Sequence, residues 1–132
     1  GVYFRSLDSL GDLVGGIYGQ NNSYAGHSQP GDALEEMVKL AKKKNYPFPY
    51  LVDETQNVTR SYGATNTPQV YVIEKRNDVF IVKYIGAIDN NTKDGKLATQ
   101  HYVASAIDAL IESKEVMVTS TKAIGCTIKW KD

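Results

Sequence analysis

The chain has 132 residues, of which 42% are hydrophobic and 23% are charged, and its fifteen basic and fifteen acidic residues balance to a net charge of zero. These values are typical of a single globular domain that is large enough to bury a core of its own. The balanced charge argues against a nucleic-acid partner, which would favour a basic surface. No apolar run approaches the roughly 20 residues that a transmembrane helix needs.

The residue types that bind metals are sparse in this sequence. It has one cysteine, Cys126, and two histidines, His27 and His101. A single thiol cannot close an internal disulfide, and it excludes a cysteine-rich zinc site. The histidines have no partners at ligand spacing, so we expect both at the surface. The oxygen-rich segment Asp89–Gly95 lacks the closing bidentate glutamate of a calcium loop, which favours a polar turn. We therefore predict no metal and no other cofactor.

The first part of the chain combines a strand, a long loop and a helix. Strand propensity is high over Val2–Asp8. Residues Ser9–Gly31 have the composition of a loop, within which Leu13–Tyr18 forms either a short helix or a strand over the core. A helix is predicted over Asp32–Asn45, because Asp32 and Glu35 are spaced as in a capping box and apolar residues follow at helical spacing.

The middle of the chain predicts a second strand and a second helix. The run Tyr46–Val52 begins extended at its two prolines and ends as a short buried strand. A helix then runs from a cap at Asp53 to Tyr62 and ends at Gly63. The neighbouring carboxylates Asp53 and Glu54 are better explained by this cap than by a catalytic pair.

A hairpin and a last helix complete the predicted elements. The hairpin pairs strands Gln69–Glu74 and Val79–Ile85 around a turn at Lys75–Asp78. A polar loop over Gly86–Gly95 leads to a helix from about Leu97 to Ser113, which has one apolar face.

This order of elements predicts an α/β fold, a three-layer α/β/α sandwich with a mixed central sheet. In it, the strand Val2–Asp8 and the strand within Tyr46–Val52 run parallel through a helical crossover. We expect one domain over residues 1–132, with residues 116–132 as a partly strand-like C-terminal tail.

Five separated motifs carry a family resemblance. In chain order they are Asn45–Gln56, Tyr62–Ala64, Thr67–Pro68, Tyr84–Asn90 and Gly125–Trp130. Together they resemble the thioredoxin-like redoxin, or AhpC/TSA, family, from about residue 32 to residue 131. The resemblance implies a thioredoxin fold with a peroxiredoxin-type helix–strand insertion, and an ancestral activity in thiol–disulfide exchange or peroxide reduction.

The resemblance also implies a site at Asn66, Thr67 and Pro68. In the family the Thr-Pro bond is cis, and the threonine backbone faces the active-site cysteine. The resemblance therefore implies a cis-proline loop and a binding site at these three residues, and an X-Pro bond costs only about 0.5–1 kcal/mol to hold cis. The alternative is an ordinary trans proline that opens a strand.

The sequence departs from the family pattern at its cysteines. The family's reactive cysteine lies at a helix N-terminus upstream of the strand matched by Val2–Asp8, and many relatives have another cysteine where this chain has Asn66. We expect that an N-terminal segment is missing or separately supplied. Alternatively, Leu10–Tyr18 provides a substitute strand. The catalytic residues stay unassigned.

Cys126 is the remaining thiol, and it allows two interpretations. We favour a small buried apolar side chain, which is how free cysteines usually behave. The alternative is a peripheral or resolving redox thiol.

Two hypotheses for function follow. The first is a protein of the thiol–disulfide oxidoreductase group without redox catalysis in this chain, whose partner is a protein thiol or disulfide. The second is a non-catalytic thioredoxin-fold subunit that binds protein within a larger assembly. The sequence does not assign a cellular compartment.

Overall fold

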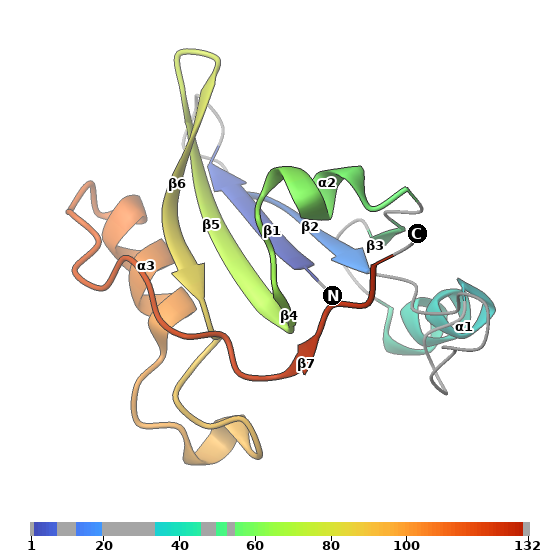
Figure 1. The fold of residues 1–132 in the computed structure, drawn as a ribbon. Coiled ribbons are helices and arrows are strands. Elements are labelled where there is room, and N and C mark those ends of the chain that lie inside the picture. Colours follow the sequence, from blue (N-terminus) through green and yellow to red (C-terminus); the bar gives the residue numbers. More distant parts are fainter. Residues whose placement is uncertain (1, 8–12, 20–33, 46–49, 53–54, 131–132) are drawn as a thin grey trace.

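The computed structural model describes residues 2–7, 13–19, 34–45, 50–52 and 55–130, which form a mixed α/β fold (Figure 1). The strands, in chain order, are β1 (Val2–Leu7), β2 (Leu13–Gly19), β3 (Tyr50–Val52), β4 (Asn66–Thr67), β5 (Gln69–Arg76), β6 (Val79–Gly86) and β7 (Cys126–Thr127). Five of them form one sheet in the order β3–β2–β1–β5–β6, and β4 pairs with β7 in a second, two-stranded sheet. The predicted α/β class with a mixed sheet is thus confirmed.

The strand β2 changes the expected topology. Of the two interpretations of Leu13–Tyr18, the structure has the strand, which pairs antiparallel with β1 and parallel with β3. The expectation that the first strand runs parallel to the strand at Tyr50–Val52 was wrong. Only five residues separate β1 from β2, and parallel partners need a much longer crossover. The parallel pair that spans the first helix is instead β2 and β3.

The described helices are α1 (Leu34–Lys44), α2 (Asn57–Ser61) and α3 (Tyr102–Ile111), with a 3-10 turn η1 at Gly95–Leu97. The second and third are shorter than the sequence predicted, and the predicted start of the first, at Asp32, lies outside the described residues. The last helix begins at Tyr102 and not near Leu97, because the residues around Leu97 form that separate turn. The second helix begins after Gln56, whose backbone is left-handed, and the predicted cap at Asp53 lies outside the described residues. The helix ends at Ser61, one residue earlier than predicted, and Gly63 follows its C-cap with φ +69°, in agreement with the predicted glycine stop.

The β5–β6 hairpin turns more tightly than expected. The turn was predicted over Lys75–Asp78, but β5 continues to Arg76 and only Asn77 and Asp78 lie between the strands. Both have positive φ, at 49° and 64°. Two-residue hairpin loops favour this conformation because its twist matches that of the strands, and Asn and Asp tolerate it well.

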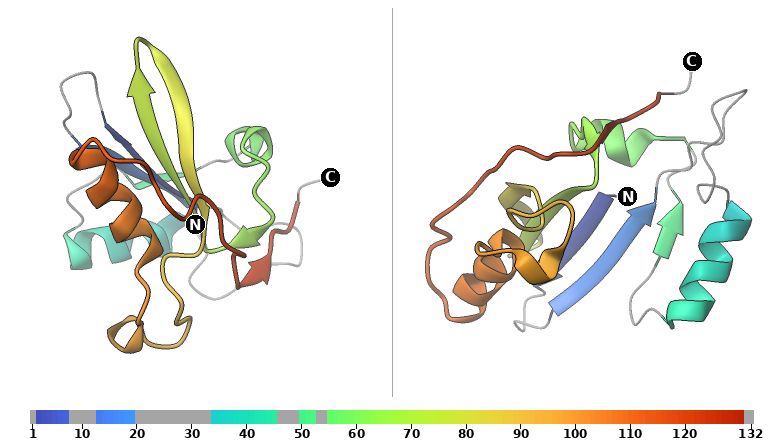
Figure 2. Two further views of the ribbon diagram at one scale, coloured as in Figure 1. Left: turned by 90° about the vertical axis from the view of Figure 1, so that its left-hand side faces the viewer. Right: turned by 90° about the horizontal axis from the view of Figure 1, so that it is seen from below.

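The core lies on both faces of β5, which is paired on both sides, with β1 and with β6. On one face Tyr71 and Ile73 pack with Ala64 and with Ile128 from the tail. On the other face Val72 and Tyr84 pack with Ala106 and Ile107 of α3. Figure 2 shows α3 against the sheet on that side, with α1 beside β3 at the far edge of the sheet.

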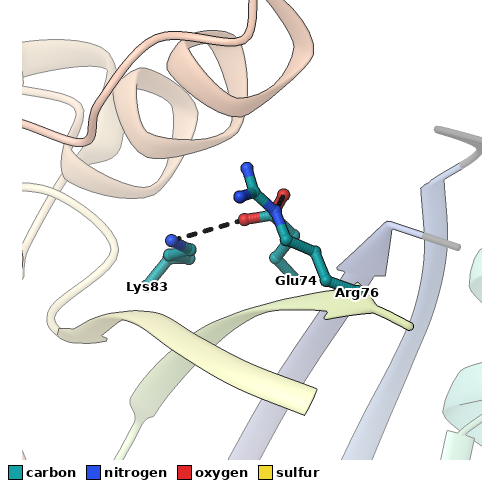
Figure 3. A network of polar contacts seen from close by, with 3 residues as sticks. All are labelled: Glu74, Arg76 and Lys83. Carbon is teal, nitrogen blue, oxygen red and sulfur yellow. Dashed lines mark hydrogen bonds and ion pairs between the residues drawn. The ribbon is translucent and has the colours of Figure 1, made fainter. Parts of the chain in front are cut away.

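A small ion-pair network lies on the same face as α3 (Figure 3). A register shift between Val72 and Ile73 leaves Lys83 as an extra residue in β6. A bulge of this kind re-aims a side chain, and Lys83 Nζ lies 3.4 Å from Glu74 Oε2. Arg76 Nε donates to Glu74 Oε1 at 2.6 Å. The Glu74 side chain is only 12% exposed, so both cations compensate a largely buried charge.

Candidate functional site

The loop Asn66–Pro68 connects the end of α2 to the buried strand β5. The peptide bond between Thr67 and Pro68 is cis. The buried side chain of Gln69 fixes the backbone before it, because Gln69 Oε1 accepts from Thr65 N at 2.9 Å and from Asn66 N at 3.4 Å. The loop is therefore held from the core side by a single amide group.

The C-terminal tail covers the other side of this loop. Strands β4 and β7 pair antiparallel, with Thr67 opposite Cys126 and Asn66 opposite Thr127. The Asn66 side chain donates to Gly125 O at 3.2 Å, and Thr67 Oγ1 donates to Cys126 O at 3.5 Å. The structure thus brings together the two candidate sites that the sequence kept apart, the cis-proline loop and the lone cysteine.

Cys126 is exposed, so the favoured expectation of a buried apolar side chain was wrong. The core position in this segment belongs to Ile128, which is 4% exposed. Side chains alternate between the faces of a strand, but a two-residue strand gives too little pattern to show which face is buried. Its neighbour Gly125 approaches the loop so closely that a Cβ there would overlap the Thr67 carbonyl and lie 3.1 Å from Pro68 Cδ.

Further contacts anchor the tail beyond β7. Ile128 N donates to Thr65 O at 3.0 Å, and the fully buried Gln56 donates from Nε2 to Lys129 O at 2.8 Å. The guanidinium of Arg60 lies 4.3 Å from the ring centroid of Trp130, a cation–π arrangement. The sequence does not predict these structural roles of Gln56 and Gln69: Gln56 is only the last residue of the family-like motif Asn45–Gln56, and a single glutamine has no periodic pattern.

The other sequence-derived candidates that the structure describes do not form a site. His101 is exposed at the N-terminus of α3, while His27, Asp53 and Glu54 lie outside the described residues. The segment Asp89–Gly95 is a polar turn as predicted. Its side-chain oxygens accept from its own backbone, for example Asn91 Oδ1 from Lys93 N and Asp94 N. Within the part of the chain that the structure describes, no three His, Cys, Asp or Glu side chains group as metal ligands.

Comparison with known proteins matches part of the chain to a known family. The model of the AhpC/TSA family matches residues 25–85. A conserved, uncharacterised protein from Geobacillus kaustophilus is 35% identical, with a TM-score of 0.67, over 88% of this chain and 58% of that one. These two matches support a place for the chain in the thioredoxin-like AhpC/TSA family. A hypothetical protein from Sinorhizobium meliloti 1021 is 25% identical, with a TM-score of 0.62, over 98% of this chain and 91% of that one. No curated protein matches the chain.

The family match covers some of the candidate site residues and not others. The AhpC/TSA match includes Asn66–Pro68 but ends before Cys126. The match therefore covers the segment Asn66–Pro68, whereas a role for Cys126 has no support from it. The chain spans 58% of the length of the Geobacillus protein.

Proposed function

We propose that this AhpC/TSA-family chain is a member of the thiol–disulfide oxidoreductase group that binds protein at Asn66–Pro68 and does not itself carry out redox catalysis. The proposal rests on which residues surround this loop. Thr67 faces the chain's own strand β7, and Asn66 stands at the position where the family resemblance would imply a cysteine. The partner would be a protein thiol or disulfide segment.

The chemistry of the group explains why catalysis is not part of the proposal. A thiolate attacks a peroxide or a disulfide, and a second thiol then resolves the product as a disulfide. This chain has one cysteine. A helix N-terminus is the usual place where a thiolate is stabilised, but Cys126 lies in the two-residue strand β7. We also propose that the chain has the finer architecture of the family, a three-layer sandwich with a peroxiredoxin-type insertion. It is supported by core clusters on both faces of β5.

The alternative, a non-catalytic subunit of a larger assembly, is favoured by the β5–β6 hairpin. Four consecutive apolar residues of β6 are between 38% and 61% exposed, namely Val79, Phe80, Ile81 and Val82. Exposed apolar groups that lie together on an edge strand are typical of interaction surfaces.

A pair of turnover assays tests the proposal. The chain and its Cys126→Ser variant are assayed with dithiothreitol as reductant, first with hydrogen peroxide and then with a mixed-disulfide substrate. We expect both proteins to match the rate without protein. Turnover by the wild-type chain that disappears in Cys126→Ser would contradict the proposal and assign the redox role to that thiol. Circular dichroism of both proteins checks that the substitution leaves the fold unchanged.

A further inference from the structure

The tail that follows α3 has two anchors, and the segment between them is held to the rest of the chain mainly by its short pairing with β4. The first anchor is at β6, where Thr121 N donates to Ile85 O at 3.0 Å and Thr121 Oγ1 lies 2.6 Å from the Tyr84 hydroxyl. The second anchor is Ile128, buried in the core cluster with Tyr71 and Ile73.

The segment between these anchors, Lys122–Thr127, is called the strap below. All its residues are exposed except the half-buried Ala123. Two exposed side-chain hydrogen bonds join the strap to β4, one from Asn66 and one from Thr67. The bond from Thr67 is long, at 3.5 Å. Segments with few buried contacts and exposed hydrogen bonds are those that open locally while the rest of a protein stays folded. The strap can therefore leave β4 without loss of either anchor.

We propose that the strap is an internal competitor for the binding edge at Asn66–Thr67, and that the ligand of this edge is an extended peptide that pairs with β4 in its place. The inference rests on the proposed function, which places binding at this loop. A strand edge whose N–H and C=O groups are free is a template for an added peptide strand. Here the edge is occupied by two residues of the chain itself, so a partner has to replace them.

The geometry also sets a requirement on the peptide. At the place of Gly125 a Cβ would overlap the Thr67 carbonyl backbone and crowd Pro68. Backbone atoms cannot move aside as a flexible side chain does. The peptide therefore needs glycine at this position, as the strap has, and any other residue there would keep it from pairing along Asn66–Thr67.

The first test measures local opening in the full chain by amide hydrogen exchange. We expect the amides of residues 125–127 to exchange at least about tenfold faster than those of Ile85 and Thr121, which belong to the first anchor. The variant Asn66→Ala, which removes one strap bond, should speed exchange in the strap by about fivefold, the effect of one exposed hydrogen bond. Equal protection of strap and anchor would overturn the inference.

The second test uses two synthetic peptides of residues 122–129. Both carry Cys126→Ser, and one also carries Gly125→Ala. Binding is measured from the amide shifts of residues 65–69 in the wild-type chain and in the chain with Gly125→Ala, whose own strap is forced off β4. If the strap is open in 1–10% of wild-type molecules, its removal tightens apparent binding by roughly 10- to 100-fold.

We expect the glycine peptide to bind the Gly125→Ala chain at least tenfold more tightly than the wild-type chain, and the alanine peptide to bind neither. Equal affinity for the two chains, equal affinity of the two peptides, or no binding would overturn the inference. Retained protection of Ile85 and Thr121 shows that the variant is folded, and should it unfold, the exchange test on the wild-type chain still decides. Turnover that depends on Cys126 would overturn the proposed function while leaving the exchange result intact.

Discussion

Two glycines let the tail approach the sheet and the loop more closely than any other residue would allow. Gly125 does so at Thr67, and Gly86 does so at the end of β6 with φ +151°. A Cβ on Gly86 would overlap the Thr121 side chain and lie 2.8 Å from Thr121 N. Positive φ and close backbone contact both favour glycine, so these residues determine where the tail can lie.

Gly86→Ala tests the tail contact at β6. We expect it to lower the free energy of unfolding by about 1–3 kcal/mol, because the substitution combines an unfavourable φ with a backbone clash. Urea denaturation followed by circular dichroism measures this change. Gly95→Ala is the matched control, since its Cβ would meet only the Asp89 side chain at 3.3 Å. An effect of Gly86→Ala no larger than that of the control would show that the tail is not held there.

Single residues of the tail were the least predictable from sequence. The motif Gly125–Trp130 was recognised as family-like, but nothing in its pattern showed that it pairs with Asn66–Thr67. The pairing depends on two residues of each strand, which is too short for a periodic signal. The sequence accordingly favours a buried Cys126 over a peripheral thiol, whereas in the structure Cys126 is exposed and Ile128 lies in the core.

The last part of the tail acts as a core element although it contains no helix and only a two-residue strand. Ile128→Ala should destabilise the protein by about 2–5 kcal/mol, since it leaves a cavity beside Tyr71 and Ile73. Ile124→Ala, at a residue 59% exposed, should change stability by less than about 0.5 kcal/mol. Both are measured as shifts in the urea midpoint with the m-value checked. Similar small losses for the two variants would mean that the tail is not part of the core.

The β5–β6 hairpin depends on the compensated charge of Glu74. Glu74→Gln should lower stability by about 1–2 kcal/mol, because Lys83 and Arg76 would lose their partner. The value is below that of a fully buried pair because Lys83 and Arg76 are 30% and 63% exposed. The control is Glu112→Gln, which removes an exposed pair with Lys114 and should cost less than about 0.5 kcal/mol. Equal effects of the two substitutions in thermal denaturation would contradict this role of Glu74.

The elements that sequence analysis predicted well are those with strong local patterns. Strands β5 and β6 have continuous β-branched and aromatic runs, and the apolar face of α3, with Ala106 and Ile107, was visible at helical spacing. The strand β2 was left open between helix and strand, because its sequence Leu13–Gly19 contains three glycines and little alternation. The pairing of β2 depends on contacts across the whole sheet. The sequence alone therefore could not show that β1 and β3 do not run parallel.

The described part of the molecule has a core cluster on each face of β5, and each cluster contains one buried tyrosine. Tyr71 and Tyr84 are 1% and 0% exposed. Tyr71 donates to Tyr62 O at 3.0 Å, and Tyr84 donates to Ala87 O at 2.6 Å. Each hydroxyl thus connects the sheet to a neighbouring loop. Because both hydroxyls are buried, both affect how the stability of the protein depends on pH.

Burial raises the pKa of both hydroxyls above the ordinary value of 10.0; for Tyr84 the hydrogen bond with Thr121 opposes this rise and the nearby Tyr102 adds to it. A raised pKa in the folded state means that the folded protein binds more protons than the unfolded chain above pH 10. The stability that these groups contribute is therefore complete below pH 10 and is lost as pH rises through the folded-state pKa. We expect the free energy of unfolding to fall above pH 10, by up to about 1.4 kcal/mol per pH unit for each tyrosine.

Denaturation at pH 8–11 should show a shallower fall in Tyr84→Phe, although this variant is less stable at neutral pH because it loses two hydrogen-bond partners. Ile128→Ala, which destabilises the core without removing a titrating group, should keep the wild-type slope. If Tyr84→Phe keeps that slope as well, the Tyr84 hydroxyl does not contribute to the alkaline loss of stability.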